Sequence, residues 1–398
     1  MGGSERMPAT LVKTEDRRPQ AAPLVGAAAI AALTVFVILF LWVESETAVA
    51  SLLVAAVAAV VVGGRLGWLG QVRKALAQHD TLLNGGALVG VLVIAAFFYH
   101  DHFALLMVAT VLLYVLACLG LTIQFGYAGI LNFSGAAFFG VGAYTAAVLT
   151  AHTPVPHLVV LLTAGAMAAL IGSILIYPVL RTRGHYAAVV TIAFALLFKT
   201  FLEVNDMLGG PQGLSVANMN LFGWDFGYGL ELGPLETSFI LNYVLLALSL
   251  VAVGMLLVKR LERSWIGLNM DAVRLDETAS ACFGIDLARW KITAFTLGNF
   301  LAGVAGALYG MMMAFIAPNN FTFADGLIMV SIVLLGGIGN PWGVAVAAVV
   351  VIVLPEKLQV IQEYRFLLFA ATVILILRFR PGGLLPRSLR QYVPGRQS

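Results

Sequence analysis

Charged residues are scarce in this sequence: Asp, Glu, Lys and Arg make up 11% of its 398 residues, whereas hydrophobic residues make up 61%. Because soluble globular domains carry about 25% charged residues, this composition excludes such a domain and indicates an integral membrane protein. The chain has only two cysteines, Cys118 and Cys282, which excludes a disulfide framework or a cysteine-based metal site. No Gly-Lys dipeptide occurs, so the chain lacks a Walker A loop for ATP.

Uncharged runs recur along the whole chain. A hydrocarbon core of roughly 30 Å needs about 20 apolar residues per helix, whereas the strands of a barrel would alternate polar and apolar residues. We therefore predict an all-α polytopic membrane protein with about 10 to 12 transmembrane segments, including broken helices. The runs are Pro23–Val43, Thr47–Gly63, Thr81–Tyr99, Phe103–Gln124, Asn132–Thr150, Leu158–Leu180, His185–Leu202, Phe239–Val258, Ile292–Ile316, Leu327–Leu354 and Phe366–Leu377.

The positions of the basic residues predict the topology. All lysines and arginines except Lys199, Lys357 and Arg365 fall in alternate loops, which the positive-inside rule assigns to the cytoplasm. These basic groups lie within residues 6–18, 65–74, 181–183, 259–291 and 378–396. The intervening loops, 44–46, 100–102, 151–157, 203–238 and 318–326, contain neither Lys nor Arg. Both termini are therefore predicted to be cytoplasmic, and the net charge of +3 does not indicate nucleic acid as a partner.

This alternation decides how the run Leu327–Leu354 is divided. A single crossing would place the C-terminal arginines outside, so we split the run into Leu327–Gly337 and Trp342–Leu354, joined by GGIGNPWG. Lys357 and Arg365 then lie outside as exceptions. At about 1.5 Å per residue the pieces reach only about 16 to 20 Å, which is the length of half-helices.

A second interrupted element occupies Leu121–Leu149. Unwound backbone is tolerated at membrane depth only where it is buried or lines a cavity, so paired broken helices predict a transport pathway. The alternative is close helix packing through small residues, which Ala302, Gly306 and Gly310 fit better. The candidate pathway residues are Gly126, Gly129, Asn132, Ser134, Gly336, Gly339 and Asn340.

A charged segment, Asp271–Phe295, lies between two apolar runs on the predicted cytoplasmic side, and we call it the charged loop. We predict an N-cap at Asp271, one helix of about three turns over residues 272–283, and a C′ glycine at Gly284. One face of this helix carries charge and the other carries apolar residues such as Phe283. Three interpretations stay open: an interfacial helix on lipid, a cap over the bundle, or a docking element for a soluble partner.

The same segment resembles the cytoplasmic EAA-type loop of ABC importer permeases, in the version found in branched-chain amino acid permeases of the LivM type. The residues that carry the resemblance are Ala272, Arg274, Asp276, Glu277, Ala279, Gly284, Ile285, Lys291, Ala294 and Phe295. Further stretches are similar to landmarks of that family: GYAGILNFSGAAFFGVGAY, VLRTRGHYAAVVTIAFALL, GGPQGLS, FIAPNNFTFADG, VLLGGIGNPWG and RPGGLLP. The similarity covers residues 104–386, and it departs from the family pattern at Glu277-Thr278-Ala279-Ser280 and at Asn132-Phe133-Ser134.

The resemblance implies a multi-pass permease of the bacterial inner membrane that imports branched-chain amino acids. It implies a second related permease, two cytoplasmic ATPase subunits and a periplasmic substrate-binding protein as partners, with no cofactor in this chain. The ATPases would dock on Arg274, Asp276, Glu277, Ala279 and Gly284 and move the 272–283 helix as a rigid lever. The same machine carrying urea, short amides or other amino acids is the alternative. The expected organisation is a cytoplasmic tail (1–22), a transmembrane extension (23–102), the permease core (103–380) and a second cytoplasmic tail (381–398).

An ion-coupled secondary transporter is the rival class, and it would need an ion site within the bilayer. Residues 103–202 contain no Asp or Glu, which argues against proton coupling, although Na⁺ bound by backbone carbonyls stays open. An enzyme is not indicated: residues 100–102, His-Asp-His, form a short polar turn without a further metal ligand, and no catalytic site is predicted.

Acidic residues accumulate in the long outer loop, residues 203–238. Asp206, Asp225, Glu231 and Glu236 occur there without any Lys or Arg. Opposite charge steers association, so this loop is either a docking surface for a basic patch on a binding protein or a plain solvated loop.

Overall fold

The computed structural model describes residues 22–43, 80–181, 186–229, 231–232 and 235–357, with isolated positions between 45 and 62 and between 364 and 387. The described residues divide into two compact units. One holds α1 (Ala22–Trp42) and most of α4 (Asp80–Phe97), and the other holds the residues from 95 onward together with residues 44–49. In the first unit a Cβ at Gly86 would lie 2.8 Å from the side chain of Ile30, so this glycine lets α4 approach α1 closely.

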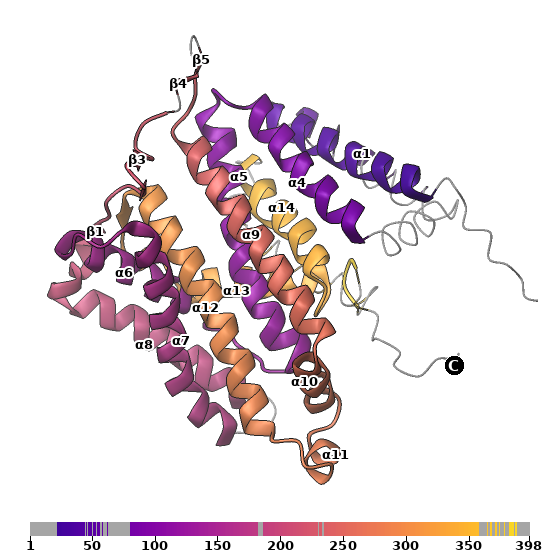
Figure 1. Ribbon diagram of the computed structural model, residues 1–398, viewed down its shortest axis with the longest axis vertical. Coiled ribbons are helices and arrows are strands. Elements are labelled where there is room, and N and C mark those ends of the chain that lie inside the picture. The colour runs from indigo at the N-terminus through magenta and orange to yellow at the C-terminus, as the bar shows by residue number, and fades with distance from the viewer. Residues whose placement is uncertain are drawn as a thin grey trace, which may run out of the picture. The chain divides into compact units, whose positions relative to one another are not determined.

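The second unit is a helical bundle with short strands in its connecting loops (Figure 1). Its helices are α5 (His102–Thr122), η1 (Ile123–Tyr127), α6 (Gly135–His152), α7 (His157–Arg181), α8 (Tyr186–Val204), η2 (Asp206–Leu208), η3 (Gly210–Gln212), α9 (Ile240–Arg263), α10 (Trp265–Leu275), α11 (Glu277–Cys282), α12 (Leu287–Met313), η4 (Pro318–Asn320), α13 (Phe323–Gly336) and α14 (Pro341–Lys357). The antiparallel strand pairs are β1 (Leu214–Ser215) with β6 (Phe315–Ile316), β2 (Asn220–Leu221) with β3 (Trp224–Asp225), and β4 (Glu231–Leu232) with β5 (Leu235–Glu236).

Seven of the described helices are long and apolar enough to cross a membrane, which confirms the predicted all-α polytopic class. The shorter apolar helices α4, α6 and α14 also fall on predicted runs. The runs Thr47–Gly63 and Phe366–Leu377 lie mostly outside the described residues, so the expected number of crossings stays a prediction.

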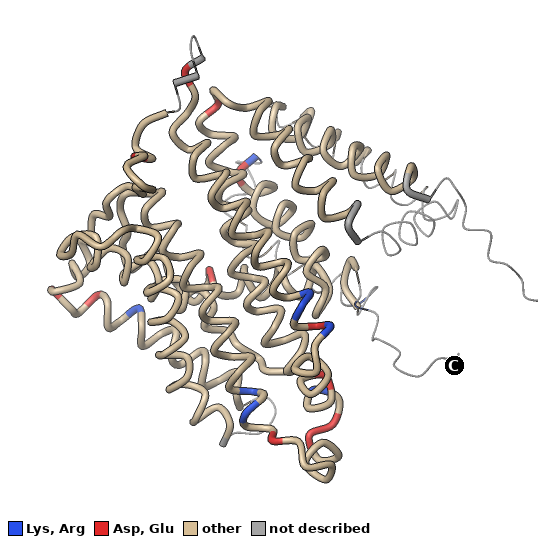
Figure 2. The backbone as a smooth tube through the Cα atoms, in the orientation of Figure 1, with Lys and Arg blue, Asp and Glu red and all other residues tan. Residues whose placement is uncertain are grey.

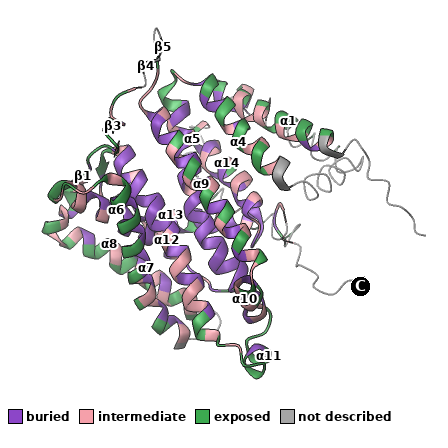
Figure 3. Cartoon of the chain, viewed as in Figure 1, coloured by how far each residue is buried: buried purple, intermediate pink, exposed green. Residues whose placement is uncertain are grey.

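Helix α12 forms the centre of the second unit, and it packs on α5, α6 and α7 (Figure 3). Glycines allow the close approach: a Cβ at Gly142 of α6 would come within 2.6 Å of the Gly303 backbone, and one at Gly306 within 2.6 Å of the Phe139 carbonyl carbon. Apolar side chains gain little by leaving lipid, so small residues stabilise such helix pairs through van der Waals contact. The packing role predicted for Gly306 is confirmed.

The loops predicted to lie outside share one end of this bundle. The Ser238 amide donates to the Tyr99 carbonyl at 2.9 Å, the Asn220 amide to His157 Nδ1 at 3.1 Å, and β1 pairs with β6. Most described lysines and arginines instead lie near the other end, where α9 finishes and α12 begins (Figure 2). The alternation of loops between the two ends is therefore confirmed for the described part of the chain.

The split of the run Leu327–Leu354 is confirmed, but the two pieces are longer than predicted. Helix α13 has 14 residues and α14 has 17, which gives lengths of about 21 and 26 Å. Helix α13 begins early because Thr322 and Asp325 form a capping box, in which the Asp325 carboxylate accepts from the Thr322 amide at 3.0 Å. Lys357 lies 5.9 Å from the Phe103 ring, at the predicted outer end. The predicted start at Leu327 is too late, because the charge of Asp325 interrupts the uncharged run although this residue lies within α13.

Candidate functional site: the broken helices and the charged loop

The two interrupted elements meet at their breaks. The first break is the stretch 123–134 between α5 and α6, and the second break is the turn 337–340 between α13 and α14. Helix α5 continues into the π-helical turn η1, and residues 128–134 are not helical before α6 begins. A Cβ at Gly126 of η1 would lie within 2.7 Å of both the Cα and the amide nitrogen of Gly339, which belongs to the turn between α13 and α14. The Tyr127 hydroxyl donates to the Gly339 carbonyl at 3.3 Å. π-Turns are frequent at functional sites, and here one brings two candidate pathway glycines into backbone contact.

Asn340 and Gly336 fix the shape of the α13–α14 turn. Asn340 Oδ1 accepts from the Trp342 amide at 3.0 Å, and its Nδ2 donates to the Leu385 carbonyl at 3.0 Å. Gly336 packs on Gly343 across the turn, where a Cβ would come within 2.6 Å of the Gly343 carbonyl group. These contacts fix the conformation of the turn between α13 and α14.

Asn132 and Ser134 lie instead in a buried network of neutral amides. Asn132 Nδ2 donates to Gln124 Oε1 at 2.7 Å, and its Oδ1 accepts from the Ser134 hydroxyl at 2.5 Å. Gln124 Nε2 donates to Asn299 Oδ1 at 2.9 Å and to the Phe295 carbonyl at 3.0 Å. The four polar side chains are at most 1% exposed, and Asn299 Nδ2 has no hydrogen-bond partner. The network ties the first break to the middle of α12.

Sequence reasoning missed Gln124 and Asn299. Their signal was present, because each is a carboxamide within or at the end of an otherwise apolar run, and a polar residue at membrane depth normally faces the protein interior. Neighbouring glycines also leave them room: a Cβ at Gly298 would lie within 2.8 Å of the Gln124 amide group.

The structure contradicts the single helix predicted over residues 272–283. Helix α10 begins after Ser264, whose hydroxyl accepts from the Gly267 amide at 3.3 Å, and it ends at Leu275. Asp276 has an extended backbone with φ −157° and ψ 108°, and its carboxylate accepts from the Ala279 amide at 3.0 Å, so it starts α11. Asp271 is not an N-cap but a buried residue within α10. The predicted rigid lever is therefore bent at Asp276.

Two charged residues of this loop have partners on the bundle. Arg274 donates to the Gly126 carbonyl, and its side chain covers Gly129, which has the left-handed φ of 69°. Glu277 forms an ion pair of 2.7 Å with Lys291 in the first turns of α12. The predicted docking residue Arg274 thus contacts the predicted pathway directly.

Gly284 ends α11 as predicted, with φ 78° and a hydrogen bond of 3.0 Å from the following Ile285 amide to the Ser280 carbonyl. Two apolar side chains of the loop face outward, with Leu275 65% and Phe283 86% exposed. The Ala279 face of α11 is also exposed. The exposed surface of the loop therefore combines these apolar side chains with charged ones such as Asp276 and Glu277.

Arg387 is the charged residue that sequence reasoning missed. Its guanidinium binds Asp271 through two hydrogen bonds of 2.7 and 2.8 Å, and its Nε donates to Glu262 at 3.0 Å. It also donates to the Gly126 carbonyl at 3.3 Å and lies 4.1 Å from the Tyr127 ring centroid. Burial alone would lower the pKa of this guanidinium, but the hydrogen bonds and negative charges around it raise the pKa above its usual value, so Arg387 stays charged.

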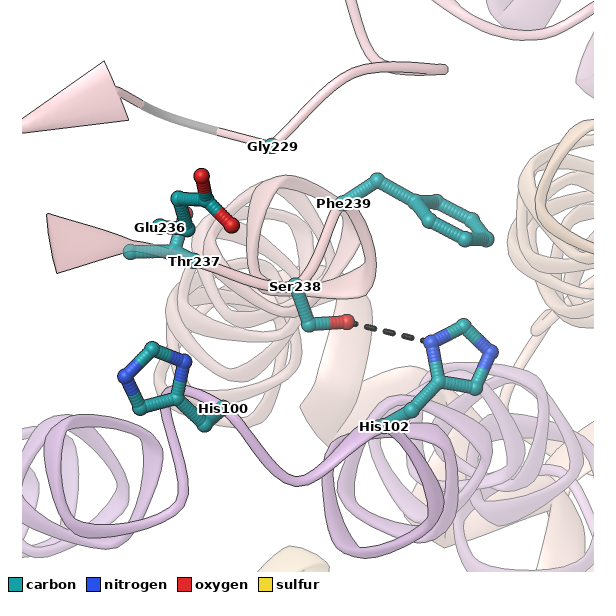
Figure 4. Close-up of a pocket in the computed structure, with 7 residues that line it drawn as sticks. All are labelled: His100, His102, Gly229, Glu236, Thr237, Ser238 and Phe239. Carbon is teal, nitrogen blue, oxygen red and sulfur yellow. Dashed lines mark hydrogen bonds between the residues drawn. The ribbon is translucent and has the colours of Figure 1, made fainter.

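A shallow pocket of about 340 Å³ lies at the outer end, between the start of α5 and the segment before α9 (Figure 4). His102 Nδ1 lies 3.2 Å from the Ser238 hydroxyl, while the Asp101 carboxylate caps α5 by accepting from the Phe103 and Ala104 amides at 3.0 Å. Within the part of the chain that the structure describes, no group of three or more His, Cys, Asp or Glu could hold a metal ion. The polar turn at 100–102 has structural partners instead.

The hairpin β2–β3 in the outer loop presents an exposed aromatic ring. Its turn residues Phe222 and Gly223 both have positive φ, 52° and 93°, and the Asn220 side chain accepts from the Gly223 amide at 3.0 Å. Such turns favour Asn or Gly, because left-handed backbone is strained for a bulky side chain. Phe222 is nonetheless 96% exposed. Strained, exposed aromatic residues of this kind often occur at functional surfaces.

The sequence of this chain is similar to those of known transport proteins. Residues 103–377 match the family described as branched-chain amino acid transport system / permease component. The chain is 34% identical over 296 residues to the high-affinity branched-chain amino acid transport system permease protein LivM of Escherichia coli (strain K12), covering 70% of this chain and 69% of that protein. It is 25% identical over 329 residues to the probable branched-chain amino acid transport permease protein LivM of Methanocaldococcus jannaschii, covering 69% and 90%. It is 22% identical over 290 residues to the permease protein LivH of Escherichia coli (strain K12), covering 69% and 91%. No solved structure matches the chain.

Proposed function

The chain belongs to the family of branched-chain amino acid transport permeases, and we propose that it is the membrane subunit of an ATP-driven importer of branched-chain amino acids. The observation that carries this proposal is the family match over residues 103–377, which includes both breaks and the charged loop. The chain would be the passive part of the machine, and ATP would be hydrolysed on separate subunits.

We assign docking of the cytoplasmic ATPases to the charged loop. The support is its exposed surface. Leu275 and Phe283 are exposed, and the Glu277 side chain is 58% exposed although it pairs with Lys291. Protein interfaces bury apolar and aromatic anchors at their centres and leave charges at the rim. Docking would therefore depend mainly on Leu275 at the end of α10 and Phe283 just after α11, and less on Arg274, which already donates to Gly126.

The substrate would pass where the breaks meet. The contact between Gly126 and Gly339 closes this place, and the neutral amides of Gln124, Asn132 and Asn299 lie in or beside the first break. A zwitterionic amino acid needs hydrogen-bond donors and acceptors for its charged groups and an apolar environment for its side chain. Opening of the glycine contact would make such amides available, and the unpartnered Asn299 Nδ2 is the donor we expect to meet a carboxylate.

We assign docking of a periplasmic binding protein to the outer loop. The support is that this loop exposes both acidic residues, Asp206 and Glu236, and large apolar ones, Met207 (91%) and Phe222 (96%). Acidic groups would steer a basic patch toward the loop, and the exposed rings would anchor it.

The remaining assignments concern assembly and location. Because the chain is similar both to LivM and to LivH proteins, each named as a permease of such a system, we propose that it pairs with a second, related permease. We also propose that the chain lies in a bacterial inner membrane, and the alternating basic loops support placing both termini in the cytoplasm.

The substrate class is tested by competition. The chain is reconstituted in vesicles with its partner subunits and binding protein, and uptake of labelled leucine is measured with ATP inside. We expect unlabelled isoleucine and valine to compete, and urea, acetamide and glutamate not to compete. Inhibition by urea or acetamide, with no effect of isoleucine or valine, would transfer the assignment to the alternative substrates.

A further inference from the structure

The C-terminal strap, defined as residues 382–385 together with Arg387, closes over the place where the two breaks meet. The Leu384 amide donates to the Leu335 carbonyl at 2.9 Å, and the Leu385 amide donates to the Gly336 carbonyl at 3.1 Å. The last carbonyls of a helix have no partner within it, so the strap caps the end of α13. The Asn340 side chain holds the strap from the other side of the turn, through the Leu385 carbonyl.

Arg387 extends the strap to the charged loop and the first break. One guanidinium joins Glu262 at the end of α9, Asp271 in α10 and the Gly126 carbonyl in η1. Its side chain is only 7% exposed, and that of Asp271 is 12% exposed. A planar guanidinium bound to both oxygens of a carboxylate has a fixed orientation, and the charges of a buried pair are screened much less than those of an exposed pair.

The contacts of Arg387 and Arg274 converge on one atom. Arg274 projects from α10 and donates to the same Gly126 carbonyl oxygen. The Gly126 backbone in turn touches Gly339 in the closed contact between the breaks. Any displacement of α10 therefore pulls on Gly126 through two guanidinium groups, one on α10 itself and one held to α10 by Asp271.

We propose that Arg387 is a positioning residue that transmits movement of the charged loop to the contact between Gly126 and Gly339. When α10 moves, Asp271 carries the guanidinium with it, and the guanidinium shifts the Gly126 carbonyl and the strap together. The strap thereby acts on both breaks at once, since it caps α13 on one side and binds η1 on the other. The proposal rests on the proposed function, because partner ATPases must supply the movement of the loop.

The test measures how much uptake each ATP hydrolysed produces. The full complex with binding protein is reconstituted in vesicles, and labelled leucine uptake and phosphate release are measured for wild type, R387Q, R387K, D271N and the double variant D271N/R387Q. The matched control is K199Q, which also removes one positive charge from an ion pair, that of Lys199 with Glu203 at 3.3 Å. Lys199 lies in α8, outside both the charged loop and the strap.

We expect R387Q to hydrolyse ATP but to lose uptake per ATP by at least about tenfold, as expected when a charge-assisted hydrogen bond is lost. R387K should retain part of the coupling, and the double variant should be no worse than either single variant, because Asp271 and Arg387 act as one unit. K199Q should behave as wild type. Should R387Q fail to assemble, R387K decides, since lysine keeps the charge but loses the bidentate geometry.

Variants that keep the wild-type uptake per ATP would overturn the proposal. This includes variants that only lower the amount of assembled complex, because a residue with a purely structural role would affect assembly and not coupling. Failure of the proposed function has a different appearance: the wild-type complex itself would show no ATP-dependent leucine uptake. If the wild-type complex shows ATP-dependent leucine uptake and the variants have the same uptake per ATP, only the role of Arg387 is contradicted.

Discussion

Replacement of Gly126 by alanine tests whether the two breaks touch through their backbones. A methyl group there would lie within 2.7 Å of the Gly339 Cα and amide nitrogen, whereas carbon atoms prefer separations of about 3.5 to 4.0 Å. The breaks must therefore separate. Overpacking costs about 1 to 3 kcal/mol, and loss of the Tyr127–Gly339 and Arg387–Gly126 hydrogen bonds adds about 1 kcal/mol each, so the total is about 3 to 5 kcal/mol.

The matched control is G284A. Gly284 also has a special conformation, with φ 78°, but no atom lies within 4 Å of a Cβ built there, so only backbone strain of about 1 to 2 kcal/mol is added. The assay is thermal unfolding of the complex in detergent, followed by leucine uptake after reconstitution. We expect G126A to unfold at a clearly lower temperature than G284A; uptake by G126A is compared with wild type, because Gly284 belongs to the predicted docking residues, and we expect it to be lost. A G126A complex that still transports leucine and unfolds at the same temperature as the G284A complex, or at a higher one, would refute the close contact.

Other consequences follow from the same contacts. F283D should reduce copurification of the ATPases without affecting the binding protein, whereas F222D should do the reverse, as a pull-down of each partner would measure; equal effects of both variants on both partners would contradict the separate surfaces. N132L should lower the free energy of unfolding of the complex by about 1 to 3 kcal/mol, because the buried Ser134 amide and hydroxyl lose their acceptor, Asn132 Oδ1. An unchanged unfolding temperature would contradict the burial of this network. D206N with D225N should slow association of the binding protein and weaken its salt dependence in surface plasmon resonance; an unchanged salt dependence would argue against electrostatic steering.

Local patterns in the sequence were sufficient for the main architecture. Uncharged runs located the helices because each must span a fixed hydrocarbon thickness, and glycine with asparagine located both breaks because these residues permit sharp turns. The alternation of basic loops required the split within GGIGNPWG, residues 336–343, and the structure ends α13 and begins α14 within this stretch.

The errors came from short-range caps and long-range contacts. Asp276 has the side chain of an N-cap, yet it lies in the middle of a segment that otherwise has helical character, so the corner between α10 and α11 was missed. Asp325 lies in the stretch predicted as an outer loop, 318–326, although it caps α13. The ion pair of Arg387 with Asp271 spans 116 residues, and the amide pair of Gln124 with Asn299 spans 175, so no local pattern could reveal either.

The central claim is that this chain is a passive membrane subunit driven by ATP hydrolysed outside it. The most direct measurement is leucine uptake in vesicles, by the single chain and by the assembled complex, with and without ATP and with an ionophore present. The account predicts uptake only by the complex, dependent on ATP and insensitive to the ionophore. Concentration of leucine by the isolated chain, without ATP and abolished by the ionophore, would contradict it.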